Sequence, residues 1–233
     1  MFMRHFALAL VLFKISLSAA KAPQPGISIL PHDRLALDAE LKSLQVKIDE
    51  IGEHTLLPDI VIFHNAVHYA LDDNMFYKPE DVPNAKHLLS IGHQRADQLK
   101  AGKHPWTKET GLVVRGYKSS LDDSVIPYGL DIPPELPQQI HKNKRLDIWL
   151  HGRNNTLSEI RFLTERLQKT SQFRPQNTIV LHPYGRFCNA YKFAGEKDVM
   201  ESLHHVKSQY TIDNERIALR GFSMGGAGAW HLG

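Results

Sequence analysis

A serine between two glycines near the carboxyl end is the residue of this chain best suited to chemistry. Residues 221–225 are Gly-Phe-Ser-Met-Gly, which fits the pattern G-x-S-x-G. In this pattern the serine lies on a sharp turn between a strand and a helix, and the glycines leave room for backbone segments that pass close together. We therefore expect Ser223 to be a nucleophile that attacks a carbonyl carbon.

The residues that flank Ser223 favour this interpretation over a glycine-rich turn without function. Ile217, Ala218 and Leu219 form a short apolar run, as in a buried strand, and the small residues 227–229 are typical of a closely packed helix. A helix that begins near Met224 directs free N–H groups and the positive end of its dipole toward the serine. That is a favourable place for an oxyanion.

A serine nucleophile needs hydrogen-bond donors for the oxyanion that forms during acyl transfer. We expect the N–H of Met224 to supply one of them and a loop after an earlier strand to supply the other. His151, Gly152 and Arg153 follow the apolar run 146–150. Gly152 allows close approach of the backbone, and the N–H of Arg153 or of Gly152 is expected to point inward. The alternative is an ordinary His-Gly turn at the end of a strand.

Strands that alternate with helices predict how these residues come together. We expect strands at 146–150, 178–182 and 216–220, and helices at 156–169 and 199–210. This order is typical of a parallel sheet with right-handed crossovers, in which the strands end at the same edge. The loops 151–155, 183–197 and 221–226 should therefore meet at that edge, where ligands bind in open α/β sheets.

Other polar residues of these loops are candidates for substrate binding. Arg153 and Arg186 could bind a substrate carboxylate through paired hydrogen bonds, or they could be solvated loop residues. Tyr184 and His151 are further candidates, because the predicted strand order brings both toward Ser223.

Two acidic residues and the single cysteine are expected to have structural roles. We expect Glu196 and Asp198 to cap the helix that follows them rather than to act as an acid or a base. Cys188 is the only cysteine, so no internal disulfide can form. We interpret it as a small buried apolar residue.

The amino-terminal half predicts a leader and a helical extension. Residues 1–22 have a basic start, an apolar stretch at 6–13 and small residues before position 22, as in a signal peptide of a secreted or periplasmic protein. Residues 23–105 combine a proline-rich linker with helices expected at 33–51, 58–71 and 84–101. The β-rich runs 111–117 and 124–130 predict an antiparallel hairpin, and we place the main domain at 106–233.

Composition and charge exclude several classes of partner. Hydrophobic residues make up 42 % and charged residues 23 %, as in an ordinary globular protein. The formal net charge of +3 is matched by Arg4, Lys14 and Lys21 of the leader, so we expect no nucleic-acid partner. His64 and His68 would share a helix face, but no glutamate follows His64 as in H-E-x-x-H, and we expect neither metal nor cofactor. No segment is long and apolar enough to predict a membrane span.

Four segments resemble the α/β-hydrolase family, and more narrowly its secreted prolyl-oligopeptidase-type serine peptidases and esterases. They are residues 149–153, 185–189, 194–198 and 220–226, within a resemblance that covers roughly residues 111–233. It implies a parallel-sheet α/β-hydrolase fold with an amino-terminal helical extension and a β-hairpin. It also implies Ser223 as nucleophile, the loop 151–153 as an oxyanion contributor, and cleavage of a small-molecule ester or peptide through an acyl-enzyme.

The chain departs from this family in one respect. In the family an Asp or Glu and then a His follow the nucleophilic serine, whereas His231 is the only histidine after Ser223. Eight residues along a helix place it roughly 12 Å away, too far for a hydrogen bond. We therefore expect the chain to be the front part of a longer hydrolase, with an incomplete fold, an unpaired sheet edge and an exposed apolar patch.

Two functions remain open at this point. The first is a serine hydrolase whose acid and base lie outside these residues. The second is a non-catalytic binding protein on a degenerate α/β-hydrolase fold. No feature of the sequence predicts an oligomeric state.

Overall fold

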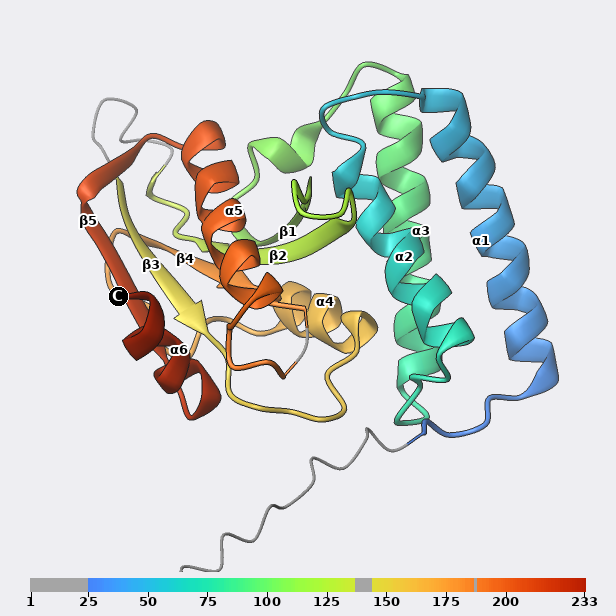
Figure 1. Cartoon of the computed structure of the whole chain (residues 1–233). Helices are drawn as coiled ribbons and strands as arrows, with labels where there is room; N and C mark the ends of the chain where they lie inside the picture. The colour runs from blue at the N-terminus through green and yellow to red at the C-terminus, as the bar shows by residue number, and fades with distance from the viewer. Residues whose placement is uncertain (1–24, 137–143, 187) are drawn as a thin grey trace, which may run out of the picture.

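The computed structural model describes residues 25–136, 144–186 and 188–233 (Figure 1). The helices are α1 (Pro31–Ile51), α2 (Pro58–Asp72), α3 (Asp81–Lys100), α4 (Glu159–Gln168), α5 (Ala194–Gln209) and α6 (Met224–Leu232). The strands are β1 (Gly111–Lys118), β2 (Val125–Ile132), β3 (Lys144–Leu150), β4 (Thr178–Pro183) and β5 (Ile212–Gly221). The signal peptide predicted for residues 1–22 lies outside the described residues.

Local sequence signals explain where the first helix begins and ends. Pro31 is its first residue, where a missing N–H costs nothing because that group has no partner within the helix. Gly52 follows its last residue and has a φ of 65°, a conformation that glycine adopts without strain. The apolar stripe at Leu37, Leu41 and Leu44 is buried, as the helical spacing predicts.

The five strands form one mixed α/β sheet in the order β1-β2-β4-β3-β5. β3 pairs parallel with both β4 and β5, which confirms the predicted strand–helix–strand pattern. The expectation of a parallel sheet is wrong for strands β1 and β2, because β2 pairs antiparallel with β4 and β1 pairs antiparallel with β2. The predicted hairpin is therefore part of the same sheet, and its strand β2 satisfies the free hydrogen-bonding edge of β4.

Helices cover the two faces of the sheet unequally. α2 and α4 pack against β1 and β2 on one face, whereas α5 packs against β4 and α6 against β3 and β5 on the other (Figure 1). β4 is buried along its whole length, but β5 has no fully buried residue. Phe222 and Trp230 beside it are 67 % and 92 % exposed. Among the described residues β5 is thus an edge strand next to exposed aromatic side chains, as the sequence predicts.

A buried polar cluster joins the helical region to the sheet. The carboxylate of Asp59 on α2 accepts hydrogen bonds from Trp106 Nε1 at 2.9 Å, Arg115 Nε at 2.8 Å and the N–H of Gly116 at 2.8 Å. Arg95 on α3 donates to the carbonyl oxygen of Asp59. The helices and the hairpin are therefore held together by charge as well as by a continuous apolar core. In the described ranges, no helix has the length and apolar character needed to cross a membrane.

Candidate active site

Ser223 lies on a strained turn between the end of β5 and the start of α6. Its φ of 53° and ψ of −116° are rare for a residue with a side chain and occur where the surrounding structure enforces them. The N–H of Phe222 donates to the carbonyl of Leu150 at 3.2 Å, and the N–H of Gly225 donates to the carbonyl of Phe222 at 2.8 Å. The first bond holds the turn against the end of β3, and the second closes the turn itself. The predicted strand–turn–helix is present, and Ser223 is exposed at its tip.

The glycines of the motif are required by backbone packing. A Cβ atom on Gly221 would overlap the carbonyl group of Gly225, and one on Gly225 would overlap the carbonyl of Leu150. Helix α6 therefore begins directly against the turn and against the end of β3. Any larger residue at 221 or 225 would displace Ser223.

The loop after β3 lies beside the serine, as the sequence predicts. A Cβ on Gly152 would lie 3.6 Å from the Cβ of Ser223 and 3.2 Å from a ring carbon of Phe222. Among the described residues, the N–H groups of Gly152, Arg153 and Met224 donate no hydrogen bond. Three backbone donors near Ser223 are therefore without an acceptor among the described residues.

His151 holds this loop rather than serving as a base for Ser223. Its Nε2 is 2.9 Å from the carbonyl oxygen of Tyr184, and its Nδ1 is 3.0 Å from that of Gly152. The hydroxyl of Tyr191 donates to the carbonyl oxygen of His151 at 3.1 Å. These contacts confirm that the loops after β3 and β4 meet. Tyr184 itself is buried and donates to the carbonyl of Leu157, so its hydroxyl is used within the core.

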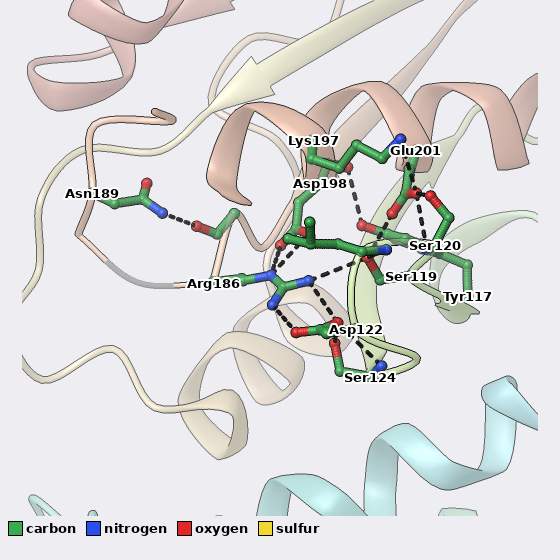
Figure 2. A network of polar contacts seen from close by, with 12 residues as sticks. Tyr117, Ser119, Ser120, Asp122, Ser124, Arg186, Asn189, Lys197, Asp198 and Glu201 are labelled. Atoms are coloured by element: carbon green, nitrogen blue, oxygen red, sulfur yellow. Dashed lines mark hydrogen bonds and ion pairs between the residues drawn. The ribbon is translucent and has the colours of Figure 1, made fainter. Parts of the chain in front are cut away.

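Arg186 belongs to a network of polar contacts instead of a free substrate-binding position. Figure 2 shows its guanidinium between Asp198 on α5 and Asp122 at the hairpin tip. Nε donates to the Asp198 carboxylate at 3.0 and 3.2 Å, and Nη2 donates to Asp122 and to Ser119, both at 3.2 Å. The expectation that Arg186 binds a substrate carboxylate is not supported by this arrangement. Arg153, by contrast, is exposed and donates to Asn155.

The predicted capping role of Glu196 and Asp198 is wrong. Helix α5 begins at Ala194, so both residues lie inside it, and the residue before it makes no side-chain cap. Asp198 is buried and paired with Arg186, and burial raises the pKa of its carboxyl to about 6 while Arg186 opposes that rise. Glu196 is exposed and its Oε2 is 3.1 Å from Nε2 of His231.

Cys188 also differs from the prediction of a buried apolar residue. It is half-buried, and its sulfur accepts from the N–H of Asn154 and donates to the carbonyl of Asn154, both at 3.3 Å. It therefore links the loops after β3 and β4. The sequence offers no signal for this contact, since the two residues are 34 positions apart.

The described residues do not assemble an acid and a base at Ser223. No described side chain forms a hydrogen bond with its hydroxyl. His231 pairs with Glu196, and His205 is 2.9 Å from the hydroxyl of Tyr128. His182 is buried among other partners, and burial holds its pKa well below the usual value.

Sequence reasoning missed a cavity of about 340 Å³ next to the serine turn. Phe222 and Gly152 form part of its wall, together with His182 from β4 and Arg166 from α4. The helical pattern over 156–169 predicts α4 but does not indicate that one of its arginines lines a cavity beside the turn of Ser223.

Comparisons with known proteins give a limited result. No protein-family model matches the chain, and no curated protein matches it. Among solved structures, a thermostable esterase aligns at 23 % identity and a TM-score of 0.35, over 51 % of this chain and 36 % of the esterase. A ferulic acid esterase aligns at 21 % identity and a TM-score of 0.36, over 51 % of this chain and 52 % of that protein. The chain thus spans about half or less of these proteins, and similarity of this extent shows neither a family nor an activity.

Proposed function

We propose that the protein is a serine hydrolase of the α/β-hydrolase type, with Ser223 as its nucleophile. The observation that carries this proposal is the strained turn at Ser223 with Gly152 packed beside it. Such strain costs free energy and is found where function requires a side chain to project from a sharp turn.

The proposed reaction forms an acyl-enzyme on Ser223. As Ser223 Oγ forms a bond to the substrate carbonyl carbon, a base accepts the hydroxyl proton and the carbonyl oxygen becomes an oxyanion. The N–H of Met224 and that of Gly152 or Arg153 donate to the oxyanion. The bond to the alcohol or amine then breaks, the leaving group takes up the proton, and water later hydrolyses the acyl-enzyme. Esters and peptides both fit this scheme, including the prolyl-oligopeptidase type of substrate.

We propose that the acid and the base come from residues that pack along β5. Among the described residues β5 pairs only with β3, and a cavity of about 480 Å³ lined by Trp149, Phe173 and Trp230 lies beside it. Further strands beside β5 would cover these aromatic side chains, and the loops that follow those strands would meet at the end of the sheet that carries Ser223. We also propose export of the protein, from the leader at residues 1–22.

Labelling with a fluorophosphonate probe tests the proposed nucleophile. The protein is isolated as its native source produces it, and its intact mass shows whether further chain is present. We expect covalent labelling at Ser223 and its loss in Ser223→Ala, but not in Ser208→Ala, which changes an exposed serine on α5. A folded protein that is not labelled at Ser223 would contradict the proposal.

A non-catalytic binding protein is the second candidate. It is favoured by the lack of any hydrogen bond between a described side chain and the Ser223 hydroxyl. This candidate predicts ligand binding that persists in Ser223→Ala without turnover by either protein. Ester or peptide hydrolysis that depends on Ser223 excludes it.

A further inference from the structure

The cavity beside the serine turn contains an arginine that, among the described residues, forms no hydrogen bond with a carboxylate. Arg166 projects from α4, and its side chain is only 17 % exposed. In the part of the chain that the structure describes, its nearest carboxylate oxygen is Oε2 of Glu165, 4.0 Å from Nη2, too far for a hydrogen bond. The Glu165 carboxylate lies closer to Arg161, at 3.2 Å, and to Lys169, at 3.5 Å. Among the described residues, the carboxylates of Glu165 and Asp131 favour the charged form of Arg166, but neither accepts a hydrogen bond from its guanidinium.

The position of Arg166 is fixed by neutral groups. Its Nη1 donates to Nδ1 of His182 at 2.9 Å, and Nε2 of His182 is 2.7 Å from the hydroxyl of Ser171. Since Nδ1 accepts, His182 is a neutral ring, and burial holds its pKa well below the usual value. The stem of Arg166 lies over Gly129, where a Cβ atom would come within 2.6 Å of its Cγ. Among the described residues, the sheet therefore positions the guanidinium without accepting a hydrogen bond from it through a carboxylate.

Most hydrogen-bond donors of Arg166 remain free. A guanidinium has five N–H donors, and the described residues accept only from Nη1. Nε and Nη2 can thus form the two parallel hydrogen bonds with which arginine binds a carboxylate. Partial burial lowers the pKa of Arg166, which reflects the cost of removing its charge from water. A bound anion would offset that cost.

The rest of the cavity wall suits an apolar group that ends in an anion. Trp149 and Phe162 supply apolar surface, while Phe222 and Gly152 connect the cavity to the nucleophile turn. Its volume of about 340 Å³ is sufficient for part of a small substrate. Lys169 and Glu165 also line the cavity and pair with each other at 3.5 Å, so the wall carries one carboxylate and two cations.

We propose that this cavity is a substrate subsite in which Arg166 binds a carboxylate carried by the acyl group or the leaving group. The substrate class is therefore an ester or amide with a carboxylate separated from the scissile bond by a short apolar spacer. This assignment of a substrate rests on the proposed function, because Ser223 supplies the reacting atom. The binding of an anion in the cavity does not depend on it.

Binding to the purified chain tests the subsite without requiring turnover. The probes are 3-phenylpropanoate and its neutral isostere 3-phenylpropanamide, compared by isothermal titration calorimetry. We expect the acid to bind about 10- to 100-fold more tightly than the amide, the range for paired hydrogen bonds to a charged group. Arg166→Gln should abolish this preference. Arg161→Gln is the matched control, since Arg161 lies on the same helix but not in the cavity wall.

Arg166→Lys keeps the charge and the stem, so it tests the paired geometry if Arg166→Gln fails to fold. It should retain only part of the preference for the acid. Equal affinity for acid and amide, no binding of either probe, or an unchanged preference in Arg166→Gln would overturn the proposal.

A turnover assay on the protein from its native source separates the two proposals. The substrates are the p-nitrophenyl esters of valeric acid and of glutaric acid, which has a free carboxylate. A higher kcat/KM for the glutarate ester that is lost in Arg166→Gln supports the subsite. Equal kcat/KM values for the two esters that depend on Ser223 would support the proposed hydrolase but contradict the proposed subsite. If neither ester is hydrolysed, the proposed function fails and the binding experiment alone decides the subsite.

Discussion

Replacement of Asp59 by alanine should be among the most destabilising single changes in this protein. Asp59 is 1 % exposed and its carboxylate accepts three hydrogen bonds, from Trp106, Arg115 and Gly116. Removing it leaves the Arg115 guanidinium, which is completely buried, without its counter-ion. Breaking a buried ion pair by removing one partner costs about 3–5 kcal/mol, since the remaining charge is uncompensated.

The assay is urea unfolding followed by far-UV circular dichroism, with the free energy of unfolding extrapolated to water. The matched control is Asp97→Ala, which removes the ion pair between Lys47 and Asp97 on the surface. That change should cost about 1 kcal/mol or less, because water screens an exposed pair. The double variant Asp59→Ala/Arg115→Met should recover part of the loss, since it no longer buries an unpaired charge.

This reasoning would be refuted if Asp59→Ala lowered the free energy of unfolding no more than Asp97→Ala does. That result would mean that Arg115 reaches water or another acceptor when the carboxylate is absent. A double variant less stable than both single variants would also contradict it.

Three further changes test other parts of the structure. Burial raises the pKa of Glu159 to about 8, so between pH 5 and pH 8 the folded state holds a proton that the unfolded state has lost. The free energy of unfolding should therefore fall by about 1.4 kcal/mol per pH unit as the pH rises toward 8. Glu159→Gln should remove this slope in urea titrations at pH 5 to 9. Arg186→Met leaves Asp198 buried without its cation and should lower the free energy of unfolding by about 2 kcal/mol at pH 8. The loss should be smaller at pH 5, where a carboxyl of pKa about 6 is protonated, and thermal melts at the two pH values measure the difference. Gly221→Ala should lower the free energy of unfolding by about 3 kcal/mol and abolish fluorophosphonate labelling. Gly226→Ala is the control, because its Cβ would meet no atom closer than 3.6 Å; it should keep the labelling and change the free energy of unfolding by about 1 kcal/mol or less.

The local features of this protein could be predicted from sequence. The strand, turn and helix around Ser223 follow from an apolar run, two glycines and small helix residues that are close together in the chain. Gly152 beside Ser223 could also be predicted, because parallel strands bring the loops at their ends to one edge. In each case the determining interactions act over a few residues or follow from a general rule of chain connection.

The partners of the charged residues required the tertiary structure. The sequence left Arg186 as either a substrate ligand or a solvated residue, whereas the fold pairs it with Asp122, 64 positions earlier. Likewise, only the packing of α4 on Gly129 places Arg166 beside His182. The residue type shows that an arginine can pair with a carboxylate, but which carboxylate it pairs with depends on which segments pack together. The fold therefore decided which charged groups pair with each other, since charge compensation acts over a few ångströms in space and not along the chain.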